Sequence, residues 1–240
     1  MPPAARGLLT PLNQAPKHPV PVFPLPGVVL FPHVVLPLHI YELRYRTMVR
    51  DALSGERLIA LATLLPGWEH DYQGSPAFHE LGCLGRIEEI EWLPNDCYDL
   101  KLRGLVRARF KKVAREFPYR ACEVEVLPSA PFEADDPLAA MERHALLEQM
   151  QKLLPLGIEA WFAPPVVAPD APFETLVNTL AQCARLDEAS KLELLAHESV
   201  FERSRVLTGK LAAMFSAPRR AAAPMPPPRE GEAGEGGRWN

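Results

Sequence analysis

Charged residues are missing from residues 18–41, although they make up 23% of the 240-residue chain. An apolar stretch of this length could span a membrane, which takes about 20 residues of helix. The stretch also contains six prolines: Pro19, Pro21, Pro24, Pro26, Pro32 and Pro37. Each proline removes a backbone donor, costs about 3 kcal/mol inside a helix and favours an extended conformation in the residue before it. The prolines exclude a membrane helix, and we predict a buried, extended and repeatedly bent ribbon.

A strongly basic charge balance is also absent. The net charge is −4, and residues 20–129 hold 13 lysines and arginines against 14 carboxylates. Residues 130–216 are more acidic, with 7 against 13. Nucleic-acid-binding domains instead carry clustered positive charge, so the composition disfavours a nucleic-acid partner.

Cysteines are few, and none lies close to another in the sequence. The four are Cys83, Cys97, Cys122 and Cys183. They form no CxxC pair and show no metal-site spacing with histidine. Residues 1–10 lack the apolar segment of a signal peptide. We therefore predict a cytoplasmic protein with reduced, mostly buried thiols, and we expect no metal and no cofactor.

The sequence pattern changes directly after the charge-free segment. Apolar residues at helical spacing are Tyr45, Met48, Val49, Ala52 and Leu53, and charged residues lie between them. This spacing predicts a helix that begins near Tyr41 and turns one face to the core.

Strands are expected at Leu58–Leu65, Gly82–Leu93, Cys97–Val113 and Arg120–Leu127. The first is a continuous apolar run, typical of a strand buried on both faces. The second and third flank the turn residues Pro94-Asn95-Asp96 and form a predicted hairpin. Gly104 lies within the third strand, where it indicates a bulge or a sharp bend. Several strands with few helices predict a small, partly closed barrel.

Helices are predicted in the later part of the chain. Asp136 and Pro137 can open one that runs to about Leu154, and an apolar stripe at helical spacing follows from Phe173 to Ala184. Asp187 can cap a third helix, and Ser199 with Glu202 forms a capping-box pattern for a fourth. The predicted regions are a flexible lead-in (1–18), a barrel domain (19–129), a helical subdomain (130–216) and a disordered tail rich in proline and glycine (217–240).

Five short motifs follow one another through the charge-free segment and the helix after it. They are Phe23-Pro24-Leu25-Pro26, Phe31-Pro32, Leu36-Pro37-Leu38, Ile40-Tyr41-Glu42 and Arg44-Tyr45-Arg46. This order resembles the opening of the Lon protease N-terminal (substrate-binding) domain family. His33 departs from it, because the family usually has glycine there. Later segments that resemble the family are Leu81–Gly85, Leu102–Phe110 and Pro118–Ala121.

The resemblance implies an α+β fold, with a PUA-like β pseudobarrel followed by a small α-helical bundle. It also implies a stand-alone, non-catalytic bacterial module that binds a polypeptide or protein partner. Its signature positions are the candidate protein-binding residues: Pro24, Pro26, Phe31, Pro32, Leu36, Leu38, Glu42, Arg44 and Tyr45. The alternative is that these residues are structural. The partner and the oligomeric state are not specified.

Catalytic motifs of an ATP-dependent protease are not found. Leu207–Leu211 contains Gly-Lys but lacks the earlier glycine of a P-loop. Ser190 and Lys191 are neighbours on a predicted helix, and side chains at i and i+1 do not face each other. Cys83 has no identifiable histidine partner, and His39 is predicted to be a hydrogen-bonded structural residue. We predict no catalytic residues, and a hydrolase is the least favoured alternative.

Cations line one face of the predicted strand Cys97–Val113. The candidate basic contact face consists of Arg103, Arg107, Arg109 and Lys111. Such a face could track the phosphates of RNA, which makes an RNA-binding PUA-like module the main alternative function. However, the face has no aromatic residues on which bases could stack. The acidic residues of the neighbouring strands, among them Glu88, Glu89, Glu91 and Glu125, can neutralise it by cross-strand pairing.

Overall fold

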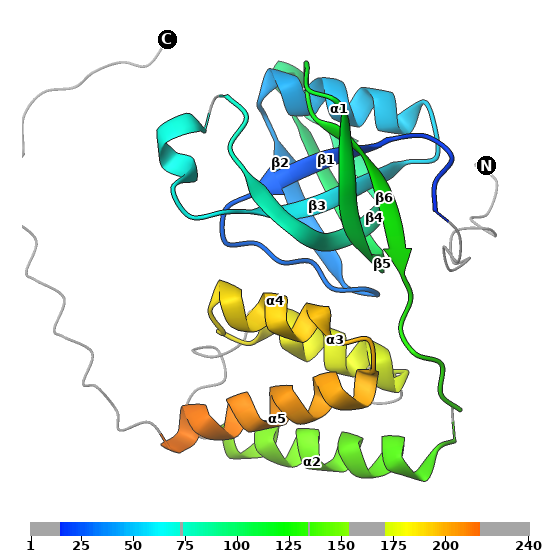
Figure 1. Cartoon of the computed structure of the whole chain (residues 1–240), viewed down its shortest axis with the longest axis vertical. Helices are drawn as coiled ribbons and strands as arrows, with labels where there is room; N and C mark the ends of the chain where they lie inside the picture. Colours follow the sequence, from blue (N-terminus) through cyan, green and yellow to red (C-terminus); the bar gives the residue numbers. More distant parts are fainter. Residues whose placement is uncertain (1–14, 73, 134, 154–170, 217–240) are drawn as a thin grey trace, which may run out of the picture.

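The computed structural model describes residues 15–72, 74–133, 135–153 and 171–216 (Figure 1). The strands are β1 (Val20–Leu25), β2 (Val35–Ile40), β3 (Leu58–Leu64), β4 (Phe78–Trp92), β5 (Tyr98–Arg115) and β6 (Ala121–Leu127). The α-helices are α1 (Leu43–Leu53), α2 (Pro137–Leu153), α3 (Phe173–Cys183), α4 (Glu188–Ala196) and α5 (Val200–Ser216). Two short 3₁₀ helices are η1 (Trp68–Asp71) and η2 (Pro94–Asp96). The predicted α+β class is confirmed.

The six strands form one mixed sheet that curls into a barrel. Their order is β2-β5-β4-β3-β1-β6, and a further pairing of β5 with β6 closes the ring. The 18-residue β5 makes this possible, because its first part pairs with β2 and its later part with β6. Strand β2 therefore lies outside the closed ring, with one edge unpaired among the described strands.

Gly104 lies where β5 changes partners. The register with β4 shifts between Val106 and Gly104, as the predicted bulge requires. A side chain at Gly104 would place its Cβ 2.2 Å from the carbonyl oxygen of Phe31. Glycine is therefore needed for close approach of the backbone as well as for the bend.

The charge-free segment is extended, as predicted, and it joins the barrel to the helices. It supplies β1, β2 and the loop between them. At the loop, Phe31 is fully buried and belongs to the apolar cluster that includes residues of α2, α3, α4 and α5. The Phe31 amide donates to Gln182 Oε1 at 3.2 Å, and Asn178 Nδ2 donates to the Pro32 carbonyl at 3.1 Å. Phe31 and Pro32 thus attach the barrel to α3.

Helices α2 to α5 form a layer on one side of the barrel, and α1 lies against the opposite side (Figure 1). Two buried arginines meet the end of α4, one from the barrel and one from within the helical layer. Arg107 of β5 donates to the carbonyls of Leu195 and Ala196, and Arg203 of α5 donates to those of Leu194 and His197. Cations at a helix C-terminus satisfy carbonyls that have no partner within the helix.

The helix boundaries follow the predicted caps, with one correction. Asp136 and Asp187 accept backbone hydrogen bonds at the starts of α2 and α4, and Ser199 does so weakly for α5. The first helix begins at Leu43 and not near Tyr41, because Glu42 is its N-cap and has extended dihedral angles. The predicted tail, most of the lead-in and residues 154–170 of the predicted helical subdomain lie outside the described residues.

Candidate binding face

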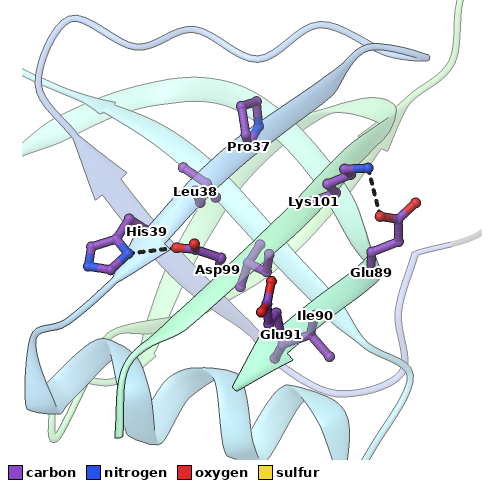
Figure 2. Close-up of a pocket in the computed structure, with 9 residues that line it drawn as sticks. Pro37, Leu38, His39, Glu89, Ile90, Glu91, Asp99 and Lys101 are labelled. Atoms are coloured by element: carbon purple, nitrogen blue, oxygen red, sulfur yellow. Dashed lines mark hydrogen bonds and ion pairs between the residues drawn. The ribbon is translucent and has the colours of Figure 1, made fainter. Parts of the chain in front are cut away.

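A hollow of about 460 Å³ lies on the outer side of β2, β5 and β4 (Figure 2). Its lining residues are Pro37, Leu38, His39, Glu89, Ile90, Glu91, Asp99, Leu100 and Lys101. Three consecutive residues from each of three adjacent strands therefore build it. We call this surface the β2–β5–β4 face.

The strand register arranges these nine residues as three rows across the sheet. Leu38, Leu100 and Ile90 are cross-strand neighbours and belong to the apolar core between the sheet and α1. Because side chains alternate along a strand, the flanking residues point to the other side of the sheet. The backbone of the middle row is therefore the floor of the hollow, and the two outer rows are its walls.

Charged groups on these walls form two ion pairs. Lys101 Nζ lies 2.7 Å from Glu89 Oε2, and His39 Nδ1 lies 2.6 Å from Asp99 Oδ1 (Figure 2). His39 is thus hydrogen-bonded, as predicted. Glu91 forms no ion pair or side-chain hydrogen bond with any residue that the structure describes. Carboxylates outnumber cations in the hollow, so the β2–β5–β4 face is acidic.

The free edge of β2 borders the same face. The Gly104 amide donates to the Val34 carbonyl, and the register with β5 continues from there without a shift. Antiparallel alternation then points the amides of even-numbered residues toward β5 and those of odd-numbered residues toward solvent. Pro37 is odd-numbered and has no N–H. Such a proline on an edge strand opposes the addition of a further strand.

The nine signature residues lie mostly within the fold. Phe31 and Pro32 contact the helices, Tyr45 is in the core, and Leu36 and Leu38 pack against that core. Leu38 also lines the hollow. Pro24 is buried in β1 and is paired in register with Ala62 of β3, and Pro26 precedes a turn at Gly27, whose φ is +67°.

Glu42 and Arg44 fix the loop that contains η1. Arg44 Nε donates to Glu42 Oε2 at 3.0 Å, and its Nη2 donates to the Tyr72 carbonyl at 3.0 Å. The Tyr72 hydroxyl donates to Glu42 Oε1 at 2.7 Å. Burial and this hydrogen bond raise the pKa of Tyr72 to about 12. These contacts are internal and give both charged residues a structural role.

The candidate basic face is largely neutralised by cross-strand pairs. Arg103 pairs with Glu88, and both Arg109 and Lys111 pair with Glu125. The hydrogen bond from Lys111, with the charge of both cations, lowers the pKa of Glu125. Acidic neighbours leave little attraction for phosphates on this face.

Arg107 departs from the predicted face altogether. It points outward from β5 as expected, but it is 3% exposed because α4 covers it. Its guanidinium donates to the Leu195, Ala196 and Pro128 carbonyls. Burial lowers its pKa. Arg107 therefore joins the two layers and is not available to a phosphate.

The structure does not support Cys83 as a nucleophile. The thiol is fully buried, and this burial raises its pKa to about 12. Such a thiol is protonated near neutral pH and out of reach of a substrate. Among the described residues, no group of three or more histidine, cysteine, aspartate or glutamate side chains is arranged to hold a metal ion.

Sequence reasoning did not single out Pro37, Asp99 or Lys101 as parts of one site. Strand alternation predicts that Asp99 and Lys101 share one side of their strand. It does not tell which strand lies beside them, because His39 and Asp99 are 60 residues apart in the sequence. The register across β2, β5 and β4 is the missing information.

The fold is a two-layer module, with a β-barrel on one side and a helical layer on the other. The family model described as the ATP-dependent protease La (LON) substrate-binding domain matches residues 19–212. The chain belongs to this family. None of the described helices is long and apolar enough to cross a membrane.

Relatives and solved structures agree with this membership. Lon protease from Heliobacterium modesticaldum is 26% identical over 200 residues, which cover 80% of this chain and 24% of that protein. Lon protease 2 from Myxococcus xanthus is 29% identical over 108 residues, covering 45% and 13%. The chain thus spans a quarter or less of either relative.

Two solved structures share the fold. One is a Lon N-terminal domain protein from Xanthomonas campestris, with a TM-score of 0.56 and 22% identity over 80% of this chain and 98% of that chain. The other is the N-terminal domain of the Mycobacterium avium complex Lon protease, with a TM-score of 0.54 and 22% identity over 81% and 98%. At this identity the likeness concerns the fold alone.

Proposed function

We propose that this chain binds extended segments of polypeptide on the β2–β5–β4 face and catalyses no reaction itself. The observation that carries the proposal is the match of residues 19–212 to a substrate-binding domain family. The relatives that share this part of the chain are named as proteases, for which a substrate is a polypeptide.

The β2–β5–β4 face has the properties that such binding needs. It is a hollow on the outer side of the sheet, and its wall residues are about half exposed. The exposed ring of Tyr41 stacks on His39, with ring centroids 6.0 Å apart, and adds an aromatic surface next to the hollow. Aromatic residues supply much of the energy of protein interfaces.

The signature residues support this function indirectly. Their contacts set the register of β2 and the attachment of the barrel to the helices, so they shape the β2–β5–β4 face without forming most of it. An RNA-binding role is disfavoured by the burial of Arg107 and by the acidic partners of Arg103, Arg109 and Lys111. We further propose a cytoplasmic location, in keeping with four free cysteines.

Binding of an unfolded protein tests the proposal. We expect reduced, carboxamidomethylated ribonuclease A, labelled with fluorescein, to gain anisotropy when this chain is added. Native ribonuclease A with the same label is the control and should not respond, because its backbone is not accessible. Equal responses, or no response to either form, would contradict the proposal. Casein incubated with and without ATP should remain uncleaved.

A further inference from the structure

The β2–β5–β4 face carries a carboxylate that the fold does not use. Glu89 is neutralised by Lys101, and Asp99 is bonded to His39. Glu91 lies beside Asp99 in the same cross-strand row and is exposed, with no ion-pair partner in the described part of the chain. All other charged groups of the hollow contribute to the sheet, whereas Glu91 is free to receive a ligand.

We infer that the hollow selects polypeptide segments that carry arginine or lysine, and that Glu91 receives the cation. This inference rests on the proposed function and names its substrate class. The nine lining residues include three carboxylates, one lysine and one histidine. An acidic segment would meet Glu89, Glu91 and Asp99 together, whereas a basic segment gains an ion pair with Glu91.

The dimensions of the hollow agree with an extended segment. Its two walls are two residues apart along each strand, which corresponds to about 6.5 Å. One long side chain of an extended segment fits between such walls. Tyr41 lies next to His39 and 61% of it is exposed. Its ring can cover an apolar neighbour of the cation or the face of a guanidinium.

Alternatively, the bound segment could pair with the free edge of β2 as an added strand, but Pro37 opposes this. A strand paired with β2 would need donors along the free edge, and Pro37 has none. Binding across the β2–β5–β4 face uses side chains and is therefore sensitive to charge. Strand addition would use the backbone and would be nearly indifferent to charge.

Three labelled peptides of one apolar sequence test the inference. They differ at two positions, which are arginine, glutamine or glutamate, and fluorescence anisotropy gives their Kd values. We expect the arginine peptide to bind about two- to fivefold tighter than the glutamine peptide, the gain of one exposed ion pair, and the glutamate peptide to bind most weakly. Added salt should reduce the difference.

Glu91→Gln should remove most of the preference for arginine, and Glu91→Lys should reverse it. Glu123→Gln is the matched control, because Glu123 is an exposed carboxylate of β6 outside the hollow, and it should bind like the unchanged protein. Circular dichroism melts establish that all three variants are folded.

The outcomes separate the two proposals. Equal affinity for the three peptides, or an unchanged preference in Glu91→Lys, would overturn the basic-segment inference while leaving polypeptide binding in place. If neither the peptides nor unfolded ribonuclease A binds, the proposed function fails and the inference fails with it.

Discussion

Charged residues have opposite roles in two regions of the molecule. One region is the contact between the barrel and the helices, and the other is the β2–β5–β4 face. At the contact, Arg107 and Arg203 are buried, and both make hydrogen bonds to carbonyls at the end of α4. On the open face, Lys101 and Glu89 are more than half exposed and form an ion pair with each other. The register shift between Gly104 and Val106 turns Arg107 to the side of the sheet that carries Cys83, whereas Lys101 lies on the opposite side. The bulge and the covering helix together therefore decide between structural and available charge.

Among the buried charged residues, Arg203 should contribute most to stability, because it is completely buried. It donates to Asn178 at 2.6 Å and lies 3.6 Å from Glu174. We expect Arg203→Met to lower the free energy of unfolding by about 3–5 kcal/mol, because it leaves Glu174 without its buried cation and two carbonyls without a donor. Urea titration measures the change.

Arg205→Met is the control for Arg203→Met. Arg205 lies two residues further on α5, pairs with Glu142 and is 57% exposed, so its loss should cost less than about 1 kcal/mol. If the free energy of unfolding falls by similar amounts in both variants, burial does not determine how much an arginine contributes to stability.

Glu174 makes the contact sensitive to acid. Burial opposes its ionisation, but hydrogen bonds from His33 and Ser129 and the charges of His33 and Arg203 lower its pKa from 4.5 to about 2. A lowered pKa stabilises the folded state fully above about pH 4.5, and the contribution is lost as the pH falls toward 2. The difference between these two pKa values corresponds to about 3 kcal/mol of folding stability. Unfolding in urea at a series of pH values should show this loss.

Glu174→Gln provides the reference for that pH series. The amide cannot ionise, so the difference in unfolding free energy between the two proteins should shrink as the pH falls from 4.5 to 2. A difference that stays constant over this range would show that Glu174 does not titrate there.

Gly104 tests whether the close approach of β5 to the loop between β1 and β2 is required. In Gly104→Ala the new Cβ would lie 2.2 Å from the Phe31 carbonyl oxygen, so the backbone must shift. We expect a loss of about 2 kcal/mol, measured by thermal unfolding. Gly55→Ala is the control, because its Cβ would meet nothing closer than 3.9 Å, and it should change the stability far less.

The elements could be predicted from the sequence, but their contacts could not. Alternation of apolar and polar residues placed the hairpin of β4 and β5, and proline placement showed that the charge-free segment is extended. Nothing local to Arg107 shows that α4, 81 to 89 residues away, covers it. Likewise, nothing local in the sequence shows that β2 pairs with β5, and this pairing brings the residues of the hollow together.

His33 illustrates what a departure from the family pattern means physically. Its φ is +68°, a conformation that glycine adopts without strain and that other residues rarely adopt. The usual glycine of the family is therefore explained by the backbone. In this chain the histidine side chain lies 3.7 Å from Glu174 and adds a contact between the loop and α3. The sequence showed the departure, and only the backbone geometry gives its reason.

The smallest expected effect belongs to Lys101→Met on the open face. The side chain of Lys101 is 51% exposed, and that of its partner Glu89 is 67% exposed. The free energy of unfolding should therefore change by less than about 0.5 kcal/mol. Arg107→Met, six residues further along β5 and beyond the bulge, should cost about 3 kcal/mol, because three carbonyls lose their hydrogen-bond donor. Loss of Lys101 also frees Glu89, so the arginine peptide should bind about twofold tighter. Weaker binding of that peptide to Lys101→Met would mean that the cation of the hollow, and not its carboxylates, contacts the ligand.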